Sequence, residues 1–265
     1  IGTFKKGLNY YHENMVKFPL YQNKAYSRNS LPYDDVNRFV EDDKGNLWIG
    51  TNGGGLVYFD RQRNTFTQYR HDAANTNSIS GNVIVSLWID HSRQLWVGTY
   101  FGGLDRFDGS QFIHYKHDPQ NSNSISDNSI WELLEDSQHH LWIGTLNGGL
   151  NRWDPATNQF RHFQQEVPSK YISALLEDKQ GNLWIGTSDG LDVRNGRTGA
   201  FRHFTNLPAV RGSLSHNNVV CIFQDSQNRI WIGTREGLDL FSPKDSSFLT
   251  LRKEDGLPDN SILNI

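Results

Sequence analysis

The sequence predicts an all-β fold, a β-propeller of six four-stranded antiparallel units, on three observations. The motif Leu-Trp-Ile-Gly-Thr occurs at 47–51, 141–145 and 183–187, with close variants at 95–99 and 230–234. The tryptophans of this motif are spaced 48, 46, 42 and 47 residues apart, which is the length of one propeller blade. The 24 glycines, together with many Asn, Asp and Ser clusters, place tight turns between short apolar runs.

Each unit carries four strand signals in a constant order. The first is an apolar run, at 83–89, 130–135, 172–177 and 219–224, whose continuous apolar character predicts a strand buried on both faces. An aspartate six residues before the tryptophan then leads through a polar turn into the tryptophan strand. A turn ending in Gly-Leu opens the third strand, and a pair of aromatic residues three apart marks the fourth. These pairs are Phe66/Tyr69, Phe112/Tyr115, Phe160/Phe163 and Phe201/Phe204.

The repeated aromatic residues are predicted to fill the space between neighbouring blades, because one small sheet cannot cover its own apolar faces. The glycine after each tryptophan is expected to relieve crowding or to accommodate a bulge. The only cysteine, Cys221, lies in an apolar run and is predicted to be a buried, inert thiol.

We expect one propeller domain over residues 1–265. Two arrangements remain open: a closed ring of six blades, or a fragment of a larger propeller sensor. The approximate units are 1–33, 34–80, 81–126, 127–168, 169–215 and 216–260, with 261–265 as the first strand of a next or ring-closing blade.

Composition argues against several functions. The net charge is -3 and charges of both signs are scattered, whereas nucleic-acid binding usually needs a basic patch or stripe. No apolar stretch approaches the ~20 residues of a membrane helix. We therefore expect no nucleic-acid partner, and a membrane association only through segments outside this chain.

No catalytic residue, metal site or cofactor is predicted, and the chain is not expected to be an enzyme. The aspartates before the tryptophans repeat from blade to blade, so Asx-turn bonding explains them. The equivalent His114, His162 and His203 lie in the outermost strand, where they are expected to be exposed and far apart. No phosphate loop or nucleophile elbow is present. A carboxylate pair assembled across the central channel remains open.

The loops between the second and third strands vary from unit to unit, so a ligand site is expected there. The sharpest candidates are Tyr100 and Phe101, adjacent aromatic residues at one loop tip. They could stack on a sugar ring or a partner, or fold over a neighbouring loop. The other candidates are Lys5, Asn52, Asn147, Asp189, Arg235 and Glu236.

Two stretches, Asp42 through Thr51 and Glu177 through Thr187, are similar to the two-component regulator propeller repeat, and the resemblance covers essentially the whole chain. It implies the periplasmic sensor region of a membrane-anchored bacterial receptor with a histidine kinase or GGDEF-type output. Several members respond to oligosaccharides, which implies an oligosaccharide or other small ligand, and a possible homodimer through the full-length receptor. The alternatives are a protein-interaction or dimerisation scaffold and, third, a propeller lyase or hydrolase.

Overall fold

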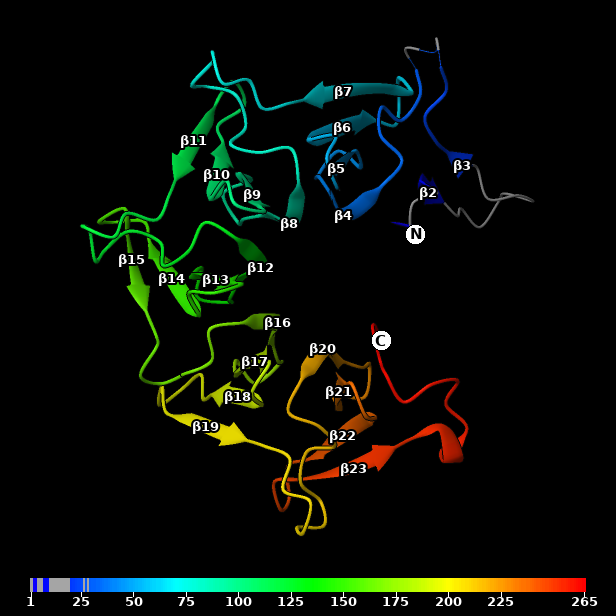
Figure 1. The fold of residues 1–265 in the computed structure, drawn as a ribbon, viewed down its shortest axis with the longest axis vertical. Helices are drawn as coiled ribbons and strands as arrows, with labels where there is room; N and C mark the ends of the chain where they lie inside the picture. Colours follow the sequence, from blue (N-terminus) through cyan, green and yellow to red (C-terminus); the bar gives the residue numbers. More distant parts are fainter. Residues whose placement is uncertain (1, 4–6, 10–19, 26, 28) are drawn as a thin grey trace. The chain divides into compact units, whose positions relative to one another are not determined.

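The computed structural model describes residues 2–3, 7–9, 20–25, 27 and 29–265, and it confirms the predicted all-β propeller fold (Figure 1). Five sheets have four antiparallel strands, and the first sheet has three strands in the described part of the chain. One 3-10 turn, η1 (Lys253–Asp255), is present. Among the described residues, no helix is long and apolar enough to cross a membrane.

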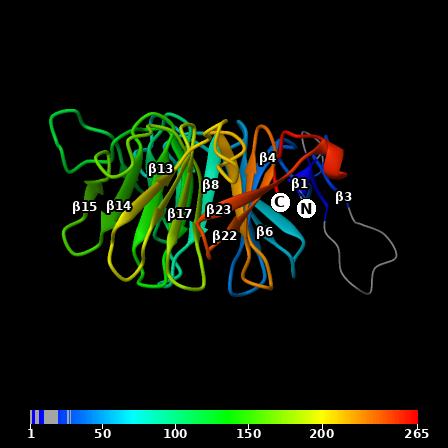
Figure 2. The ribbon, with the colours of Figure 1, turned by 90° about the horizontal axis from the view of Figure 1, so that it is seen from below.

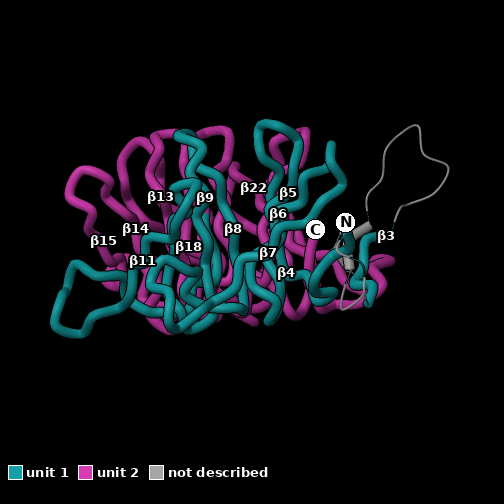
Figure 3. The backbone as a smooth tube through the Cα atoms, turned by 90° about the horizontal axis from the view of Figure 1, so that it is seen from above, with its two compact units in different colours: residues 1–133 teal, residues 134–265 magenta. Residues whose placement is uncertain are grey.

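The chain divides into two compact units, residues 1–133 and 134–265, which Figure 3 colours separately. The strands of the first unit are β1 (Gly2–Thr3), β2 (Gly7–Asn9), β3 (Leu20–Tyr21), β4 (Val36–Glu41), β5 (Leu47–Thr51), β6 (Leu56–Asp60), β7 (Thr65–Tyr69), β8 (Ile84–Ile89), β9 (Leu95–Thr99), β10 (Leu104–Phe107) and β11 (Phe112–Tyr115).

Strand β12 (Ile130–Glu135) begins in unit 1 and ends in unit 2. The strands that follow are β13 (Leu141–Thr145), β14 (Leu150–Asp154), β15 (Gln159–His162), β16 (Ile172–Glu177), β17 (Leu183–Thr187), β18 (Leu191–Arg194), β19 (Phe201–Phe204), β20 (Val219–Gln224), β21 (Ile230–Thr234), β22 (Leu238–Ser242) and β23 (Ser247–Leu251).

Each four-stranded sheet follows the chain order, as in β4-β5-β6-β7 and β16-β17-β18-β19, so neighbouring strands are joined by hairpins. The loops lie at the two ends of the strands, which the perpendicular view shows for β13 and β17 (Figure 2). The tryptophan strands begin and end at the residues that the motif predicts. Residues 261–265 are not in a strand, although the Ile262 amide donates to the Thr234 carbonyl oxygen at 2.9 Å, so their place in a further blade stays a prediction.

The first strand carries a β-bulge near its start in four of the blades, where two residues face one on the neighbouring strand. The pairing slips between Val36 and Arg38 in β4 and between Ile84 and Ser86 in β8, and β16 and β20 slip at the same place. A bulge turns the side chain of its extra residue in a new direction. The prediction that the first strands are buried on both faces is wrong for β20, where only Val219 is buried. Strand β4, for which the sequence makes no such prediction, has no buried residue.

In four blades the glycine two residues after the tryptophan lies against side chains of the bulge or of the following apolar run. A Cβ atom on Gly50 would lie 2.6 Å from Ile84 Cγ2, and one on Gly186 would lie 2.7 Å from Val219 Cγ1. Such distances are too short for two carbon atoms, so the expected role of these glycines in relieving crowding is confirmed. In both units apolar clusters fill the space between neighbouring sheets, as the sequence predicts.

The aspartate before each tryptophan organises the first hairpin of its blade. In all five hairpins its Oδ1 accepts the backbone N–H four residues later, which confirms the Asx-turn interpretation. In four blades its Oδ2 also accepts the indole N–H of the tryptophan at 2.7–3.0 Å, a bond that the sequence analysis missed. These pairs are Asp90–Trp96, Asp136–Trp142, Asp178–Trp184 and Asp225–Trp231.

Candidate ligand-binding site

A cavity of about 390 Å³ opens in unit 1 beside the first strands β4, β8 and β12. Its volume is within the ~300–1,000 Å³ range typical of small-molecule sites. Two of the predicted ligand residues, Asn52 and Tyr100, lie on its wall. The full lining is Asn37, Arg38, Asn52, Val83, Val85, Tyr100 and Trp131.

The bulges explain why the inner strands reach this cavity. Asn37 and Val85 are the extra residues of the bulges in β4 and β8, and Trp131 is the second residue of β12, the corresponding position. The side chains therefore point away from the sheet ladder and toward the cavity. The Asn37 amide also donates to the Ile84 carbonyl oxygen at 2.9 Å, which holds the two neighbouring strands together.

Backbone hydrogen bonds hold the two loop tips against these strands. The Asn52 N–H donates to the Asp35 carbonyl oxygen at 2.8 Å, and the Tyr100 N–H donates to the Val83 carbonyl oxygen at 3.0 Å. The Asn52 amide donates to Asp35 Oδ2 at 3.1 Å. Both side chains are thus presented by anchored loops, and Tyr100 keeps 38% of its surface exposed.

The only charged residue in the lining is Arg38, and it pairs with Glu132 of β12. Burial raises the pKa of the Glu132 carboxyl to about 7, while the Arg38 guanidinium opposes this rise. Glu132 is not part of the lining, but it pairs the one charged lining residue with a carboxyl that titrates near neutral pH. The wall thus combines two aromatic rings, two primary amides and one guanidinium.

Phe101 belongs to the same loop but does not line the cavity. It has a left-handed backbone, with φ of 70°, and 66% of its surface is exposed. Its ring lies 4.0 Å from the Tyr100 ring, centroid to centroid, at 48°. The positive φ turns the Phe101 side chain outward, so the two adjacent aromatic residues have different surroundings.

The predicted ligand residues of unit 2 lie at exposed loop tips: Asn147, Asp189, Arg235 and Glu236. The Thr187 and Thr234 hydroxyls accept the backbone N–H groups of Asp189 and Glu236 at 3.0 and 3.1 Å, so both tips have the same turn. The Glu236 carbonyl oxygen also accepts from Arg252 at 3.0 Å. Lys5 lies outside the described residues.

Sequence reasoning missed the inner-strand residues Asn37, Arg38 and Trp131. In the other blades the first strand is an apolar run, which predicts burial. At 36–41 the polar residues Asn37, Arg38 and Glu41 interrupt this run. A bulge is expected at the glycine of the tryptophan strand, but the residue that it turns aside is not predicted, because that depends on how the two strands pair. Arg38 and Glu132 were nevertheless visible as charges in a strand position that holds Ala174 and Cys221 elsewhere.

Of the three histidines predicted to be exposed on the fourth strand, His203 is exposed, whereas His114 and His162 are half-buried. His114 Nδ1 is 2.6 Å from Asp105 Oδ1, and His203 Nδ1 is 2.9 Å from Asp192 Oδ1. Both aspartates are buried in the third strand. The bond to Asp105 raises the pKa of His114. Each of the two histidine–aspartate bonds links the third and fourth strands of its blade.

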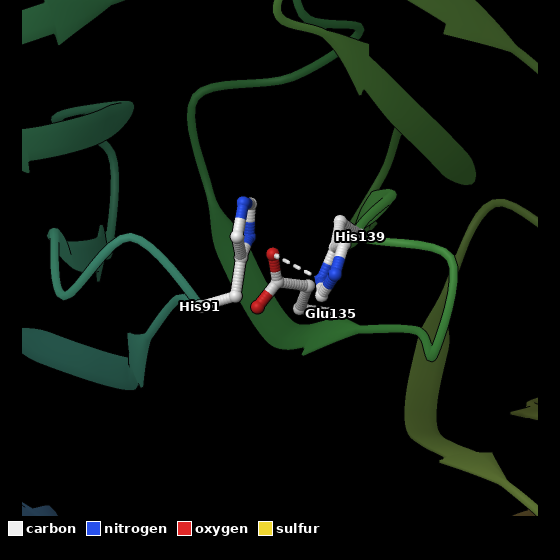
Figure 4. A group of neighbouring side chains, drawn as sticks. All are labelled: His91, Glu135 and His139. Atoms are coloured by element: carbon white, nitrogen blue, oxygen red, sulfur yellow. Dashed lines mark ion pairs between the residues drawn. The ribbon is translucent and has the colours of Figure 1, made fainter.

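The structure also describes the surroundings of the cysteine and of a histidine in a first hairpin. Desolvation raises the pKa of the Cys221 thiol to about 11, which keeps it protonated and unreactive at neutral pH. The prediction of an inert thiol agrees with this, but the residue is half-buried and not fully buried. In unit 2, His139 Nδ1 lies 3.8 Å from Glu135 Oε1 beside the first hairpin (Figure 4). The figure also labels His91, which belongs to unit 1.

The fold defines the chain as an all-β propeller domain, and comparison with known families specifies it further. Four segments match the family described as "Two component regulator propeller": residues 30–53, 124–147, 166–189 and 213–236. The two stretches that resemble the repeat, Asp42 through Thr51 and Glu177 through Thr187, lie within these segments. No curated protein sequence matches it significantly.

Solved structures show the same fold. The extracellular domain of the putative hybrid two component system BT3049 from B. thetaiotaomicron is 27% identical, with a TM-score of 0.69 over 81% of this chain. This chain spans only 29% of that domain. Virginiamycin B lyase from Staphylococcus aureus is 15% identical, with a TM-score of 0.59, and covers 82% of this chain and 69% of its own. At that identity the likeness concerns the fold alone.

Proposed function

We propose that the chain is the extracytoplasmic, periplasmic ligand-sensing propeller of a bacterial signal-transduction receptor. The support is the match to the two component regulator propeller family and the similarity to the extracellular domain of a putative hybrid two component system. In this proposal the domain binds a ligand without transforming it, and any dimer forms through the full-length receptor.

The proposed ligand is a carbohydrate bound in the cavity beside Tyr100. The observation that carries this proposal is the lining, in which Tyr100 and Trp131 accompany the amides of Asn37 and Asn52. Aromatic rings pack against the apolar faces of sugar rings, and amides can donate to and accept from hydroxyl groups. Because the tips are held by backbone bonds, the site needs little ordering on binding, which favours affinity.

The test is calorimetric titration of the folded chain with a panel of neutral and acidic oligosaccharides, using wild type and the variants Tyr100→Ala and Trp131→Ala. We expect one class of sugar to bind and each variant to weaken it about tenfold or more. Phe101→Ala is the matched control, since this aromatic neighbour lies outside the lining, and it should bind within about twofold of wild type.

Two outcomes would contradict the proposal. One is that no oligosaccharide binds to the well-folded chain. The other is that a sugar binds equally well to the Tyr100→Ala and Trp131→Ala variants. The second outcome would keep a carbohydrate ligand but remove it from this cavity.

A further inference from the structure

One of the five aspartate–tryptophan pairs is broken in unit 1. In the blade β4–β7, Asp42 Oδ2 accepts the hydroxyl of Tyr58 at 3.0 Å instead of the indole N–H of Trp48. The Asn46 amide in turn donates to the Tyr58 oxygen at 2.8 Å. Trp48 Nε1 has no hydrogen-bond partner among the residues that the structure describes, and the residue is only half-buried.

Trp48 lines a cavity of about 480 Å³ between the sheets β4–β7 and β8–β11. Its apolar wall also includes Ile89 and Phe107, whose ring lies 5.5 Å from Trp48 in an edge-to-face arrangement. This cavity lies near the first hairpins, whereas Asn52 and the Tyr100 cavity lie beyond the other end of β5. The two cavities share no lining residue.

Charged groups of both signs surround the opening. Asp43 and Arg93 come from the first hairpins of the two neighbouring blades, and their side chains form an ion pair at 2.8 Å. Lys44 and Asp108 also line the cavity. Backbone N–H groups of Gln111 and Ser110 lower the pKa of Asp108 to about 2, so this acceptor is ionised at neutral pH.

We propose that this cavity is a second ligand site, independent of the one beside Tyr100, and that it takes a neutral sugar of one or two pyranose rings. The apolar face of the ring packs on Phe107 and Ile89, and a ring or hydroxyl oxygen accepts the N–H of Trp48. Other hydroxyls donate to Asp43 or Asp108 and accept from Arg93 or Lys44. The volume is within the range of small-molecule sites, and the Trp48 N–H, which no protein group among the described residues occupies, is available to a ligand oxygen.

The experiment is ligand-observed NMR and calorimetry on the full chain with maltose, cellobiose and lactose, and with the dipeptides Gly-Gly and Ala-Ala. Trp48→Phe keeps an aromatic ring but removes the N–H, so the disaccharide Kd should rise about two- to tenfold. The matched control is Trp184→Phe, where the N–H is already taken by Asp178 at 2.7 Å, and its Kd should match wild type. Thermal unfolding of both variants verifies that they are folded.

Tyr100→Ala separates the two sites, since it affects only the first. A disaccharide Kd that rises when Trp48→Phe is added to the Tyr100→Ala variant supports the second site whether or not the first site binds sugar. Equal affinity of Trp48→Phe and wild type overturns the proposal. Binding of dipeptides alone, or of no probe at all, also overturns it.

Discussion

Two grooves between blades, one in each unit, contain the same motif and differ in one hydrogen bond. In unit 2, Trp184 is 3% exposed and its N–H donates to Asp178. In unit 1, Trp48 is half-buried and its N–H is not bound by Asp42. Both tryptophans meet an aromatic residue of the next blade edge-to-face, Phe241 at 5.0 Å and Phe107 at 5.5 Å.

The cause of the difference lies on the third strand. Trp48 pairs across the sheet with Tyr58, and Trp184 pairs with Val193. The Tyr58 hydroxyl can reach the aspartate that the tryptophan would otherwise use, whereas valine has no polar group. A repeat motif therefore predicts the local turn, but a cross-strand neighbour decides which bond its side chains make.

The largest expected effect comes from removing the buried ring. Trp184→Ala should lower the free energy of unfolding by about 3–5 kcal/mol, because it leaves a cavity between two blades. Trp48→Ala should cost at least about 1 kcal/mol less, since the ring is partly exposed and has no hydrogen bond to lose. Urea unfolding of the two variants measures the difference, and equal losses would contradict the comparison.

The second prediction contrasts the inner strands of the two units. The third residue is Arg38 in β4 and Glu132 in β12, but Ala174 in β16 and Cys221 in β20. The pKa of Glu132 rises from 4.5 to about 7 on folding, so the folded state holds this proton more tightly than the unfolded state. Stability from this group is therefore fully present below about pH 4.5 and is lost as the pH rises through about 7.

Glu132→Gln removes this titration. The fall in unfolding free energy between about pH 4.5 and pH 7 should therefore be smaller in the variant than in wild type, by on the order of 1 to 3 kcal/mol. Denaturant titrations at pH 5 and pH 8 provide the measurement. Glu41→Gln is the control, because this carboxylate is exposed on β4 and its removal should leave the slope unchanged. A slope as steep in Glu132→Gln as in wild type would refute the prediction.

The third prediction concerns the hairpin aspartates. Asp178→Ala removes the turn bonds and leaves the buried Trp184 N–H without a partner, at a cost of about 1–3 kcal/mol. Asp42→Ala removes equivalent turn bonds, but the hydroxyl that it frees belongs to the half-buried Tyr58, which can donate to water and still accepts from Asn46, so its loss should be smaller. Thermal and urea unfolding compare the two variants, and the opposite order would break the proposed distinction.

The smallest effect on stability, within about 1 kcal/mol, is expected for exchanging the cross-strand neighbour. Tyr58→Val should let Asp42 accept the Trp48 N–H, and Val193→Tyr should release Trp184 from Asp178. Indole hydrogen exchange measured by NMR should slow for Trp48 in the first variant and quicken for Trp184 in the second. Unchanged exchange in both would show that another feature decides the bond. Tyr58→Val should also weaken sugar binding in the Trp48 cavity.

The sequence by itself determined the repeat, and through it the strands and turns. Period, apolar runs, glycines and aspartates are local signals, because a turn or a strand depends on residues a few positions apart. The Asx turns and the crowding at Gly50 followed from them. So did two residues of the candidate cavity, Asn52 and Tyr100, since variable tips stand out against a constant repeat.

Only the tertiary structure decided which residues meet. The bulges that direct Asn37 and Val85 into the cavity depend on pairing with the next strand. The Arg38–Glu132 pair joins positions 94 residues apart, and the partner of Trp48 depends on Tyr58 across the sheet. The outward turn of Phe101 likewise separates it from Tyr100. Such contacts are made by side chains that converge only when the blades pack, so no local pattern records them.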